Sequence, residues 1–344
     1  MPGRLLVLGG SWFLGRTVAE TAVQGGWHVT VFRRGRPESG AAPDGVEVVH
    51  GHYGDPMAMR RLTERGPFDL VVDNLAYTPR ETLAAAQVLE PVAARYVVVS
   101  SVSAYEGWPT QPLTEDSPTL PCSATAGPEP GYNGDPAPTT YGFGKAGCEV
   151  AVLETFGRER AVIARPGVIL GPGEYVGRTA WWLNRMRRGG NVVAPQPADR
   201  AIQPVDVRDV ASFVLSAPPG TFNVTGDGSD TFADFIHACR EAAPAPDGTE
   251  VHWVHPKILL AHHVKQWTGL PLWRTHAGAW AVDSSRARAA GLTTRPIVET
   301  VRDTAAWLAD GGHLVASDRA SELGITPEEE AAILAGHRRV LRAR

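Results

Sequence analysis

The sequence is poor in the residues that disulfides, metal sites and membrane spans require. Three of its 344 residues are cysteines (Cys122, Cys148 and Cys239), an odd number without the close spacing of metal ligands. Such usage is typical of a reducing compartment. No apolar run approaches the roughly 18 residues of a membrane-spanning helix, and the opening residues turn glycine-rich too early for a signal peptide. We therefore expect a cytoplasmic protein with no metal site and no membrane partner.

Lysine is as scarce as cysteine. The 37 Asp and Glu residues outnumber the 33 Lys and Arg residues, and the net charge is −4. A negative total without a dense basic stripe disfavours nucleic acid as a partner. The chain has only three lysines and seven tyrosines, so a Tyr-x-x-x-Lys spacing is not expected by chance. One nevertheless occurs, at Tyr141 and Lys145.

The first half of the chain alternates short apolar runs with amphipathic segments, which is typical of βαβ units and a parallel sheet. Between these segments, residues 106–139 carry eight prolines with little periodicity, so we expect a long loop there, of the kind that often serves as a lid or binding loop. The pattern predicts strands at 4–10, 28–35, 46–51, 68–77, 95–105 and within 160–173, and helices at 13–26 and 140–157.

After about residue 174 the alternation loosens. We expect a helix at 181–190, a strand and helix within 202–217 and a helix at 231–243, while 251–282 cannot be assigned. The tryptophans of this half either line an apolar pocket or form core. The predicted fold class is α/β: a doubly wound parallel-sheet Rossmann fold with a smaller C-terminal substrate-binding lobe. The predicted domains are 1–173 for dinucleotide binding, 174–312 mainly for substrate binding with some segments returning to the first domain, and 313–344 as a helical tail.

The tail begins with a capping-box pattern. Thr326 is placed to cap a helix, Pro327 to occupy its first position and Glu329 its third. The acidic start and basic end of this segment suit the helix dipole. These features predict a stable helix and indicate no function.

The stretch "VLGGSWFLGR" (7–16) follows a predicted strand and opens a predicted helix, the context that a dinucleotide-binding turn requires. Glycine lets the backbone approach a pyrophosphate, and the free N–H groups of the helix start face the anion. A tight turn without ligand is the alternative. The cofactor-binding candidates here are Gly9, Gly10, Ser11, Trp12, Phe13, Leu14 and Gly15.

Cofactor choice is expected at the end of the second predicted strand. An acidic residue there would accept the ribose hydroxyls of NAD, but the chain has Arg33 and Arg34. Guanidinium groups match a phosphate by bidentate hydrogen bonding. NADP(H) is therefore favoured and NAD(H) is possible; the alternative is that both arginines are solvated surface residues.

Tyr141 and Lys145 are spaced four residues apart, so on a helix they share one face. A free tyrosine, with a pKa of about 10, is a poor base, and lowering that value by about 3 units takes roughly 4 kcal/mol. A nearby ammonium group and an oxidised nicotinamide both favour the phenolate. Ser101 follows the fifth predicted strand, at the edge of the sheet where ligands of such folds bind.

These segments resemble the short-chain dehydrogenase/reductase superfamily, in its extended or atypical NAD-dependent epimerase/dehydratase branch. The resemblance covers about residues 4–310 and rests on six segments. They are "GGSWFLGR", "SSVSAYEG", "YGFGK", "RPGVILGPG", "PVDVRDVA" and "AVDSSRARAAGLTTRP".

The resemblance implies a role for each matching residue. Tyr141 would be the general acid and base, and Lys145 would bind the nicotinamide ribose and lower the pKa of that tyrosine. Ser101 would hold the reacting oxygen, with Ser103 as the alternative. It also implies cofactor contacts at Leu75, Ala76, Ser100, Tyr141, Lys145, Pro166, Gly167 and Val168, and a homodimer formed through the helices near 79–93 and 140–157.

Three positions depart from the family pattern. Trp12 stands where the middle glycine is expected, as in an atypical subset with the pattern GGTxFLG. His52 occupies the place of an acidic residue near the adenine. Ile202 stands where nucleotide-sugar enzymes have a phosphate-binding arginine, and Arg200 is two residues away. A nucleotide-sugar substrate is therefore the less expected one.

The leading hypothesis is an NAD(P)-dependent reductase or dehydrogenase that interconverts a ketone and a secondary alcohol on a small metabolite. The alternative keeps the site but makes the protein an epimerase or dehydratase of a sugar-nucleotide-like substrate with a retained cofactor. Arg33 and Arg34 count against it, because such enzymes commonly retain NAD. A further alternative is a non-catalytic relative that senses NADP or binds RNA.

Overall fold

The computed structural model describes residues 3–35, 41–134, 137–312 and 321–342. The chain forms two compact units, each assembled from three segments. The first unit comprises Met1–Ile169, Val207–Asp227 and Ala277–Thr294, and the second comprises Leu170–Asp206, Gly228–His276 and Arg295–Arg344.

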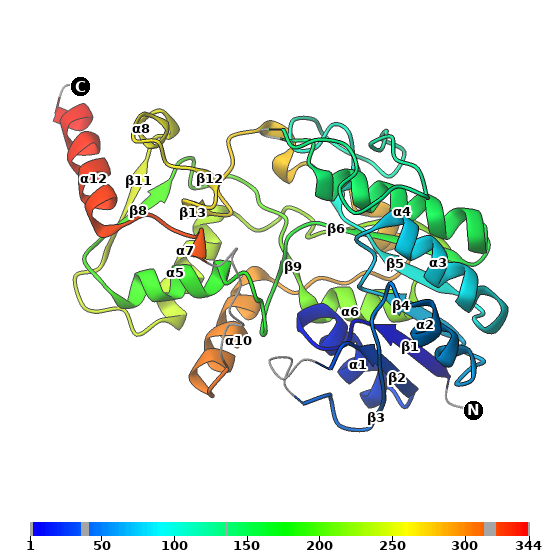
Figure 1. The fold of residues 1–344 in the computed structure, drawn as a ribbon. Helices are drawn as coiled ribbons and strands as arrows, with labels where there is room; N and C mark the ends of the chain where they lie inside the picture. Colours follow the sequence, from blue (N-terminus) through cyan, green and yellow to red (C-terminus); the bar gives the residue numbers. More distant parts are fainter. Residues whose placement is uncertain (1–2, 36–40, 135–136, 313–320, 343–344) are drawn as a thin grey trace. The chain divides into compact units, whose positions relative to one another are not determined.

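The first unit is built around a seven-stranded sheet in which every pair of neighbours is parallel (Figure 1). The strand order is β10-β6-β5-β4-β1-β2-β3. Strands β1 to β3 are added toward one edge and β4 onward toward the other, so the topological switch point lies between β1 and β4. This confirms the predicted Rossmann-type fold, in which ligands bind beyond the carboxyl ends of the strands at such a switch point. The strands are β1 (Arg4–Leu8), β2 (His28–Arg33), β3 (Val46–His50), β4 (Leu70–Asp73), β5 (Tyr96–Val99), β6 (Ala161–Pro166) and β10 (Gly220–Val224).

Helices cover both faces of this sheet (Figure 1). On one face, α2, α3 and α4 pack side by side over a core in which strand residues such as Leu6 and Tyr96 meet helix residues such as Leu89 and Val152. On the other face, α1 packs against α6. The helices are α1 (Phe13–Gln24), α2 (Pro56–Thr63), α3 (Pro79–Leu89), α4 (Thr140–Phe156), α6 (Val207–Ser216) and α9 (Ser285–Ala289), with short 3₁₀ turns η2 (Glu90–Val92), η3 (Val102–Ala104) and η4 (Ala277–Trp280).

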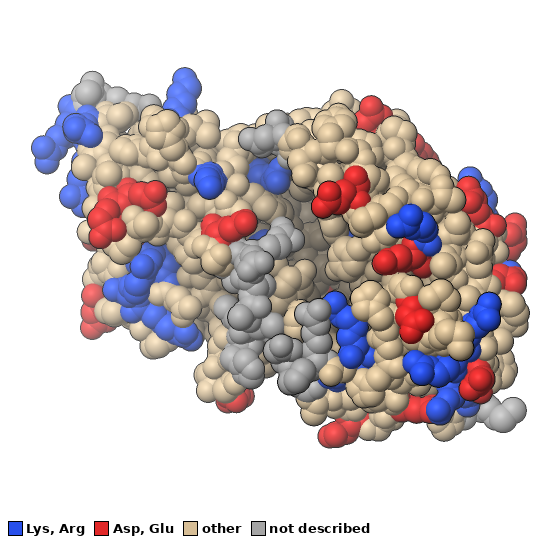
Figure 2. Space-filling model, in the orientation of Figure 1, with Lys and Arg blue, Asp and Glu red and all other residues tan. Residues whose placement is uncertain are grey.

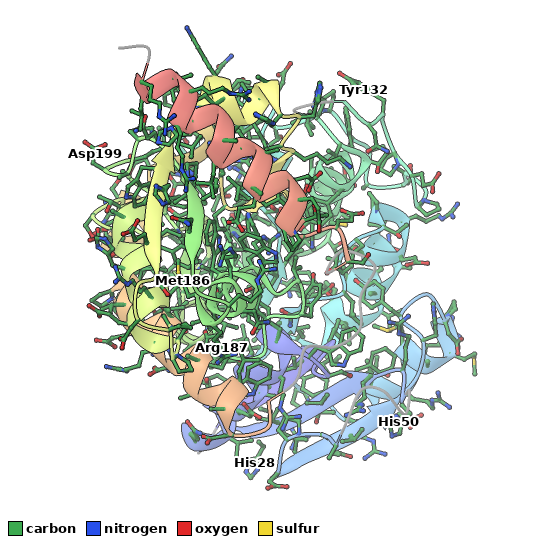
Figure 3. The ribbon with its side chains drawn as sticks, turned by 90° about the vertical axis from the view of Figure 1, so that its left-hand side faces the viewer. His28, His50, Tyr132, Met186, Arg187 and Asp199 are labelled. Carbon is green, nitrogen blue, oxygen red and sulfur yellow. The ribbon has the colours of Figure 1, made fainter. Side chains whose placement is uncertain are left out.

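Figure 3 locates the carboxyl edge of the sheet. His28 begins β2 and His50 ends the neighbouring β3, and the two residues lie at opposite ends of this parallel pair (Figure 3). The site described below therefore lies toward the end of the sheet that His50 marks.

The predicted strands at 68–77 and 95–105 were too long. β4 ends at Asp73 and β5 at Val99, and the apolar residues beyond them are buried outside the sheet, Ala76 in a loop and Val102 in η3. These residues are apolar because they are buried, not because they pair in the sheet, so the apolar run in the sequence is longer than the strand. These loops carry the candidate site.

The proline-rich segment 106–139 forms neither α-helix nor named strand in its described residues. It is nevertheless attached to the first unit, through a bridge between Tyr105 and Thr119 and through Leu113. Leu113 donates its N–H to Ala281 (2.9 Å), accepts from the N–H of Asp283 (2.8 Å) and packs in an apolar cluster. The predicted loop is confirmed.

The second unit contains smaller sheets and five helices in its described residues. Its core includes Trp182, whose ring meets the rings of Phe232 and Phe235 edge-on. Trp182 and Trp273 are buried, so for these two the core alternative holds. The elements are α5 (Arg178–Arg187), β8 (Asn191–Pro195), β9 (Val205–Asp206), α7 (Phe232–Ala242), β11 (Glu250–Val254), α8 (Pro256–Ala261), β12 (Gln266–Trp267), β13 (Leu270–Pro271), α10 (Ile297–Ala309) and α12 (Pro327–Arg342), while β7 (Ile169–Leu170) stands at the boundary of the units.

The capping box at the start of α12 is confirmed. The N–H of Thr326 donates to the carboxylate of Glu329 (2.7 Å), and the N–H of Glu329 donates to the Thr326 hydroxyl (3.2 Å). The helix is anchored by buried Glu330, which accepts from Arg185 Nε (2.9 Å) and from the N–H of Val193 (3.0 Å). The tail helix thus belongs to the second unit.

Candidate active site

Helix α4 places Tyr141 and Lys145 on one face. The helix begins after Thr139, whose hydroxyl accepts the N–H of Gly142 (3.2 Å), so Tyr141 lies in the first turn. The Tyr141 side chain is 44% exposed, whereas Lys145 one turn later is 3% exposed. The pair therefore combines a reachable phenol with a buried ammonium group.

Lys145 is held by the loops at the carboxyl ends of two neighbouring strands. Its Nζ donates to the carbonyls of Ala76 (2.9 Å), beyond β4, and Val99 (2.8 Å), the last residue of β5. The same nitrogen lies 4.3 Å from the ring centroid of Tyr77 and 5.6 Å from that of Tyr141. Lys145 thus joins the helix to the edge of the sheet where ligands of this fold bind.

The charge of Lys145 is favoured despite its burial. Burial acts to lower the pKa of Lys145, but the facing Tyr141 and Tyr77, then Cys148 and Asp73, outweigh it and raise that pKa above its ordinary value. Lys145 therefore stays an ammonium group at neutral pH.

Glycines explain how α4 comes so close to these loops. A Cβ added at Gly142 would stand 2.3 Å from the carbonyl oxygen of Ser103, and one at Gly144 would stand 2.7 Å from that of Tyr77. Both separations are shorter than a Cβ tolerates against backbone. The "YGFGKAG" segment therefore lets the helix bring its tyrosine and lysine against both loops at once.

The serine segment lies beside the start of α4. Ser101 is 8% exposed, and its hydroxyl accepts the N–H of Ser103 (3.1 Å) as the cap of η3. Ser103 is half-buried, with its carbonyl against Gly142. The preceding Ser100 donates its hydroxyl to the buried carboxylate of Glu149. The structure thus brings Ser101 to the same carboxyl edge of the sheet as Tyr141 and Lys145. The Ser100 side chain is instead directed to buried Glu149.

The glycine turn has the close packing of an anion cradle. Gly9 has a φ of +87°, and a Cβ at Gly15 would stand 2.0 Å from the Gly9 carbonyl. Leu14 is buried, Gly10 packs against Val31, and Ser11 and Trp12 lead into α1. No side chain caps α1 and its first turn holds no acidic residue, so the N–H groups of that turn suit a pyrophosphate.

Arg33 and Arg34 stand beside this turn. The N–H of Gly9 donates to the carbonyl of Phe32 (3.0 Å), which ties the turn to the end of β2. Arg33, the last residue of β2, is 6% exposed, and Arg34 is exposed. Of the two, Arg34 is therefore the one that solvent or a phosphate can reach directly.

The remaining cofactor candidates come from β4 and β6. The side chain of Leu75 packs over Gly9, and Ala76 is buried with its carbonyl on Lys145. Pro166 ends β6, and the N–H of Gly167 donates to Val224 (3.2 Å). Gly167 and Val168 are half-buried beyond the strand. All these residues lie at or beyond the carboxyl ends of strands.

Asp73 is a buried carboxyl group that sequence reasoning missed. It is 0% exposed and accepts hydrogen bonds from Tyr53 Oη (2.6 Å), Tyr96 Oη (2.7 Å) and the N–H of Leu75 (2.7 Å). Burial raises the pKa of Asp73, against the opposing effect of those hydrogen bonds and of Lys145. The bond to Leu75 fixes the loop that carries Ala76. The one available signal was an aspartate ending an otherwise apolar strand.

Glu149 and Arg165 form a second buried network. Arg165 Nε donates to Glu149 (2.8 Å), as does Nη2 (2.5 Å), and its guanidinium lies 4.5 Å from the Tyr105 ring centroid. Burial acts to lower the pKa of Arg165, but Glu149 outweighs it and raises that pKa. Because Glu149 follows Lys145 by one helical turn, this pair anchors α4 to β6.

The two other departures from the family pattern are also located. Ile202 is 1% exposed, and the nearby Arg200 donates its guanidinium to the carbonyl of His276 (2.7 Å). His52 is exposed, and its ring accepts the N–H of Gly54 (3.3 Å).

Among the described residues, no group of His, Cys, Asp and Glu side chains is arranged to hold a metal ion. None of the described helices is both long and apolar enough to cross a membrane.

Residues 5–220 match the NAD dependent epimerase/dehydratase family, and the chain belongs to that family. The resemblance inferred from the sequence motifs is thereby confirmed. A nicotinamide dinucleotide is accordingly the cofactor that the family and the glycine turn both indicate.

Two curated relatives have similar sequences. The chain is 25% identical over 274 residues to the chloroplast stem-loop binding protein of 41 kDa b of Arabidopsis thaliana, a match that covers 74% of this chain. It spans 66% of that relative, just under two thirds of its length. It is 26% identical over 310 residues to dTDP-6-deoxy-L-talose 4-dehydrogenase (NAD(P)(+)) of Kitasatospora kifunensis, covering 78% of this chain and 91% of the relative.

Solved structures share the fold. The Bordetella bronchiseptica enzyme WbmG, in complex with NAD and UDP, has a TM-score of 0.66 at 19% identity over 91% of this chain and 96% of its own. UDP-glucose 4-epimerase of Thermotoga maritima, with UDP-glucose, has a TM-score of 0.65 at 17% identity over 90% and 99%. At these identities the likeness shows the fold alone.

Proposed function

We propose that the protein is an NAD(P)-dependent oxidoreductase that interconverts a secondary alcohol and a ketone on a sugar-nucleotide substrate. The observation that supports this most is the placement of Tyr141 and Lys145 on α4, beside Ser101 at the carboxyl edge of the sheet. Relatives whose names state a substrate act on dTDP-6-deoxy-L-talose or UDP-glucose. They favour the sugar-nucleotide alternative over the small-metabolite hypothesis.

In this proposal the three side chains divide the proton and oxygen chemistry. During oxidation, the Tyr141 oxygen accepts the hydroxyl proton as the carbonyl forms, and Ser101 Oγ donates a hydrogen bond to the substrate oxygen. The nicotinamide, when bound, supplies the acceptor for the hydride that leaves the same carbon. The positive charge of Lys145, near the Tyr141 ring, favours a negative charge on the tyrosine oxygen. Reduction reverses each step.

The same residues also serve an epimerase or dehydratase, in which the substrate is oxidised, rearranged and reduced again by one retained cofactor. The difference lies in cofactor exchange rather than in the Ser–Tyr–Lys chemistry. A dehydrogenase releases the altered dinucleotide at each turnover, whereas an epimerase ends each turnover with the dinucleotide it began with. Product analysis together with dinucleotide absorbance therefore separates the two.

NADP(H) is the proposed cofactor, with NAD(H) as the alternative. Arg34 supports this preference because it is exposed directly after β2, two residues beyond Phe32, whose carbonyl accepts the N–H of Gly9 in the glycine turn. A guanidinium there would pair with the 2′-phosphate of NADP by two hydrogen bonds. The family description names NAD, so the preference for NADP rests on Arg34 of this chain and not on the family.

A non-catalytic role is the second candidate, because one relative is a stem-loop binding protein. Two observations weigh against RNA as the partner of this chain. The net charge is −4, and on the face drawn in Figure 2 the Lys and Arg side chains are interspersed with Asp and Glu. The Tyr141–Lys145 pair is also intact, which a protein without turnover does not require.

Replacing the pair tests the proposed function. With a panel of UDP- and dTDP-sugars and either dinucleotide, Tyr141→Phe and Lys145→Met should each slow turnover about 10²- to 10⁴-fold, the usual contribution of acid–base catalysis. Tyr132→Phe is the matched control, since it removes the hydroxyl of another exposed tyrosine (labelled in Figure 3). The Tyr132 ring is tilted by 53° against the ring of Phe143, and their centroids lie 5.4 Å apart. Unchanged rates in both site variants, with circular dichroism showing native folds, would sink the proposal.

The homodimer and the cytoplasmic location stay predictions. The resemblance implies a dimer contact through the helices near 79–93 and 140–157, which correspond to α3 and α4 of the first unit.

A further inference from the structure

Tyr77 stands against the ammonium group of Lys145, although no sequence motif pointed to it. The Lys145 Nζ lies over the Tyr77 ring, 4.3 Å from its centroid, closer than to the ring of Tyr141 at 5.6 Å. The Tyr77 side chain is 52% exposed, while Lys145 is 3% exposed. An exposed aromatic ring therefore covers a buried cation.

The Tyr77 backbone is held on both sides. Its N–H donates to the carbonyl of Leu75 (2.8 Å), and its own carbonyl lies so close to Gly144 that a Cβ there would stand 2.7 Å away. Helix α3 begins two residues later, at Pro79. The loop therefore presents this ring to Lys145 from a fixed position, unlike a free surface side chain.

The ring completes the surroundings of the lysine. An ammonium group has three N–H donors, and two of them go to Ala76 and Val99. The face of an aromatic ring attracts a cation and excludes water from it. The Tyr77 and Tyr141 rings are themselves neighbours, with centroids 6.2 Å apart and planes at 46°.

We propose that Tyr77 is a positioning residue of the catalytic site, whose ring shields Lys145 from water and so strengthens the action of its charge on Tyr141. This rests on the proposed function and deepens it. A charge acts more strongly on its neighbour where water is excluded, because the effective dielectric constant is lower. The other ionisable groups that act on Lys145 are Asp73 at the end of β4 and Cys148 on α4 itself. Glu149, one helical turn after Lys145, is paired with Arg165.

The scarcity of lysine makes the shielding measurable without any substrate. The tryptic peptide that carries an acetylated Lys145 contains no other lysine, so mass spectrometry can follow its acetylation with Lys257 and Lys265 as internal references. Tyr77→Ala should raise the acetylation rate of Lys145 about fivefold or more, because water and reagent gain access to it. Tyr77→Phe, which keeps the ring, should label like the parent protein.

Tyr132→Ala is the matched control, since it removes another exposed tyrosine ring of the same unit and should leave Lys145 labelling unchanged. An unaltered Lys145 rate in Tyr77→Ala would overturn the proposal. So would a Tyr77→Phe rate as fast as that of Tyr77→Ala, because the ring would then not be the shield.

The pH dependence of turnover tests the action on Tyr141. When water screens Lys145, its charge acts less strongly on the neighbouring Tyr141, so the pH at which the turnover of Tyr77→Ala is half-maximal should be higher by about half a unit or more. Tyr77→Phe should restore the parent profile. An unshifted profile in Tyr77→Ala, alongside lost turnover in Tyr141→Phe, would overturn this role while leaving the proposed function standing. If the parent protein lacks turnover altogether, the proposed function fails, and the labelling still decides whether Tyr77 shields Lys145.

Discussion

At the scale of single residues, two buried ionisable groups hold one short loop. Lys145 binds the carbonyl of Ala76, and Asp73 accepts the N–H of Leu75. A carboxyl group and a cation thus hold two adjacent residues of the loop, Leu75 and Ala76. Neither residue tolerates loss of its partners, because an unpaired buried charge or polar group costs several kcal/mol.

The raised pKa of Asp73 leads to a prediction about stability and pH. A carboxyl group whose native pKa lies above its ordinary value of 3.8 contributes stability that is fully present below pH 3.8 and is lost as the pH rises through the native pKa. Asp73→Asn cannot ionise. The unfolding free energy of the parent protein minus that of Asp73→Asn should therefore fall as the pH rises, by at most about 1.4 kcal/mol per pH unit.

Urea unfolding of both proteins from acid to neutral pH measures this difference. The amide of the variant has one oxygen where the carboxyl group has two, so it cannot accept all the hydrogen bonds that Asp73 accepts, including the one from the N–H of Leu75. The stability lost in this way does not vary with pH, so the slope is unaffected. A difference that grows with rising pH would contradict the account, since it would mean that the native fold favours the ionised form of Asp73.

What the sequence revealed about the site depended on whether a residue's role was local. The Tyr141–Lys145 spacing is a property of one helix, so the sequence predicted the shared face. Other residues of the site act through partners that are distant in the sequence. Asp73 contacts Tyr96, 23 positions away. Tyr77 contacts Lys145, 68 positions away, and Glu149 contacts Arg165, 16 positions away. No spacing in the sequence records such contacts.

At the scale of elements, the glycines of α4 decide how the site is assembled. Gly142 and Gly144 admit the carbonyls of Ser103 and Tyr77 at distances that a side chain would forbid. The predicted helix at 140–157 matches α4 closely because its cap and its C-terminal glycine are local signals. The strand ends were predicted less well, because burial continued past the last paired residue.

Helix α12 is predicted to depend on one buried ion pair. Glu330→Gln leaves the Arg185 guanidinium, which also donates to the carbonyls of Gly189 and Asn191, without its counter-charge. Breaking such a pair by removing one partner costs about 3–5 kcal/mol. Hydrogen exchange should therefore show lost protection of the α12 amides.

Glu328→Gln provides the matched control, because the same chemical change falls on the exposed side of the same helix. It should leave the exchange of α12 unaltered. Equal protection in Glu330→Gln and the parent protein would mean that apolar contacts, and not this ion pair, hold the helix.

At the scale of the whole molecule, the alternation of strands and helices was enough to predict a parallel α/β sheet in the first unit. The edge strand β10 and α9 were missed, although later segments were expected to return to the first domain, because which segments return is decided by tertiary packing. The segment 251–282 resisted assignment because its elements are short: β12 and β13 have two residues each. The division into a dinucleotide-binding and a substrate-binding part stays a prediction.

In the proposed function, this chain works with a nicotinamide dinucleotide held at the glycine turn. The most direct test is calorimetric titration of the purified protein, freed of any bound nucleotide, with NADPH and with NADH. Both should bind, and NADPH should bind more tightly, because the exposed Arg34 guanidinium would pair with the 2′-phosphate. Tighter binding of NADH would contradict the cofactor preference and favour the epimerase or dehydratase alternative. Binding of neither would contradict the account as a whole.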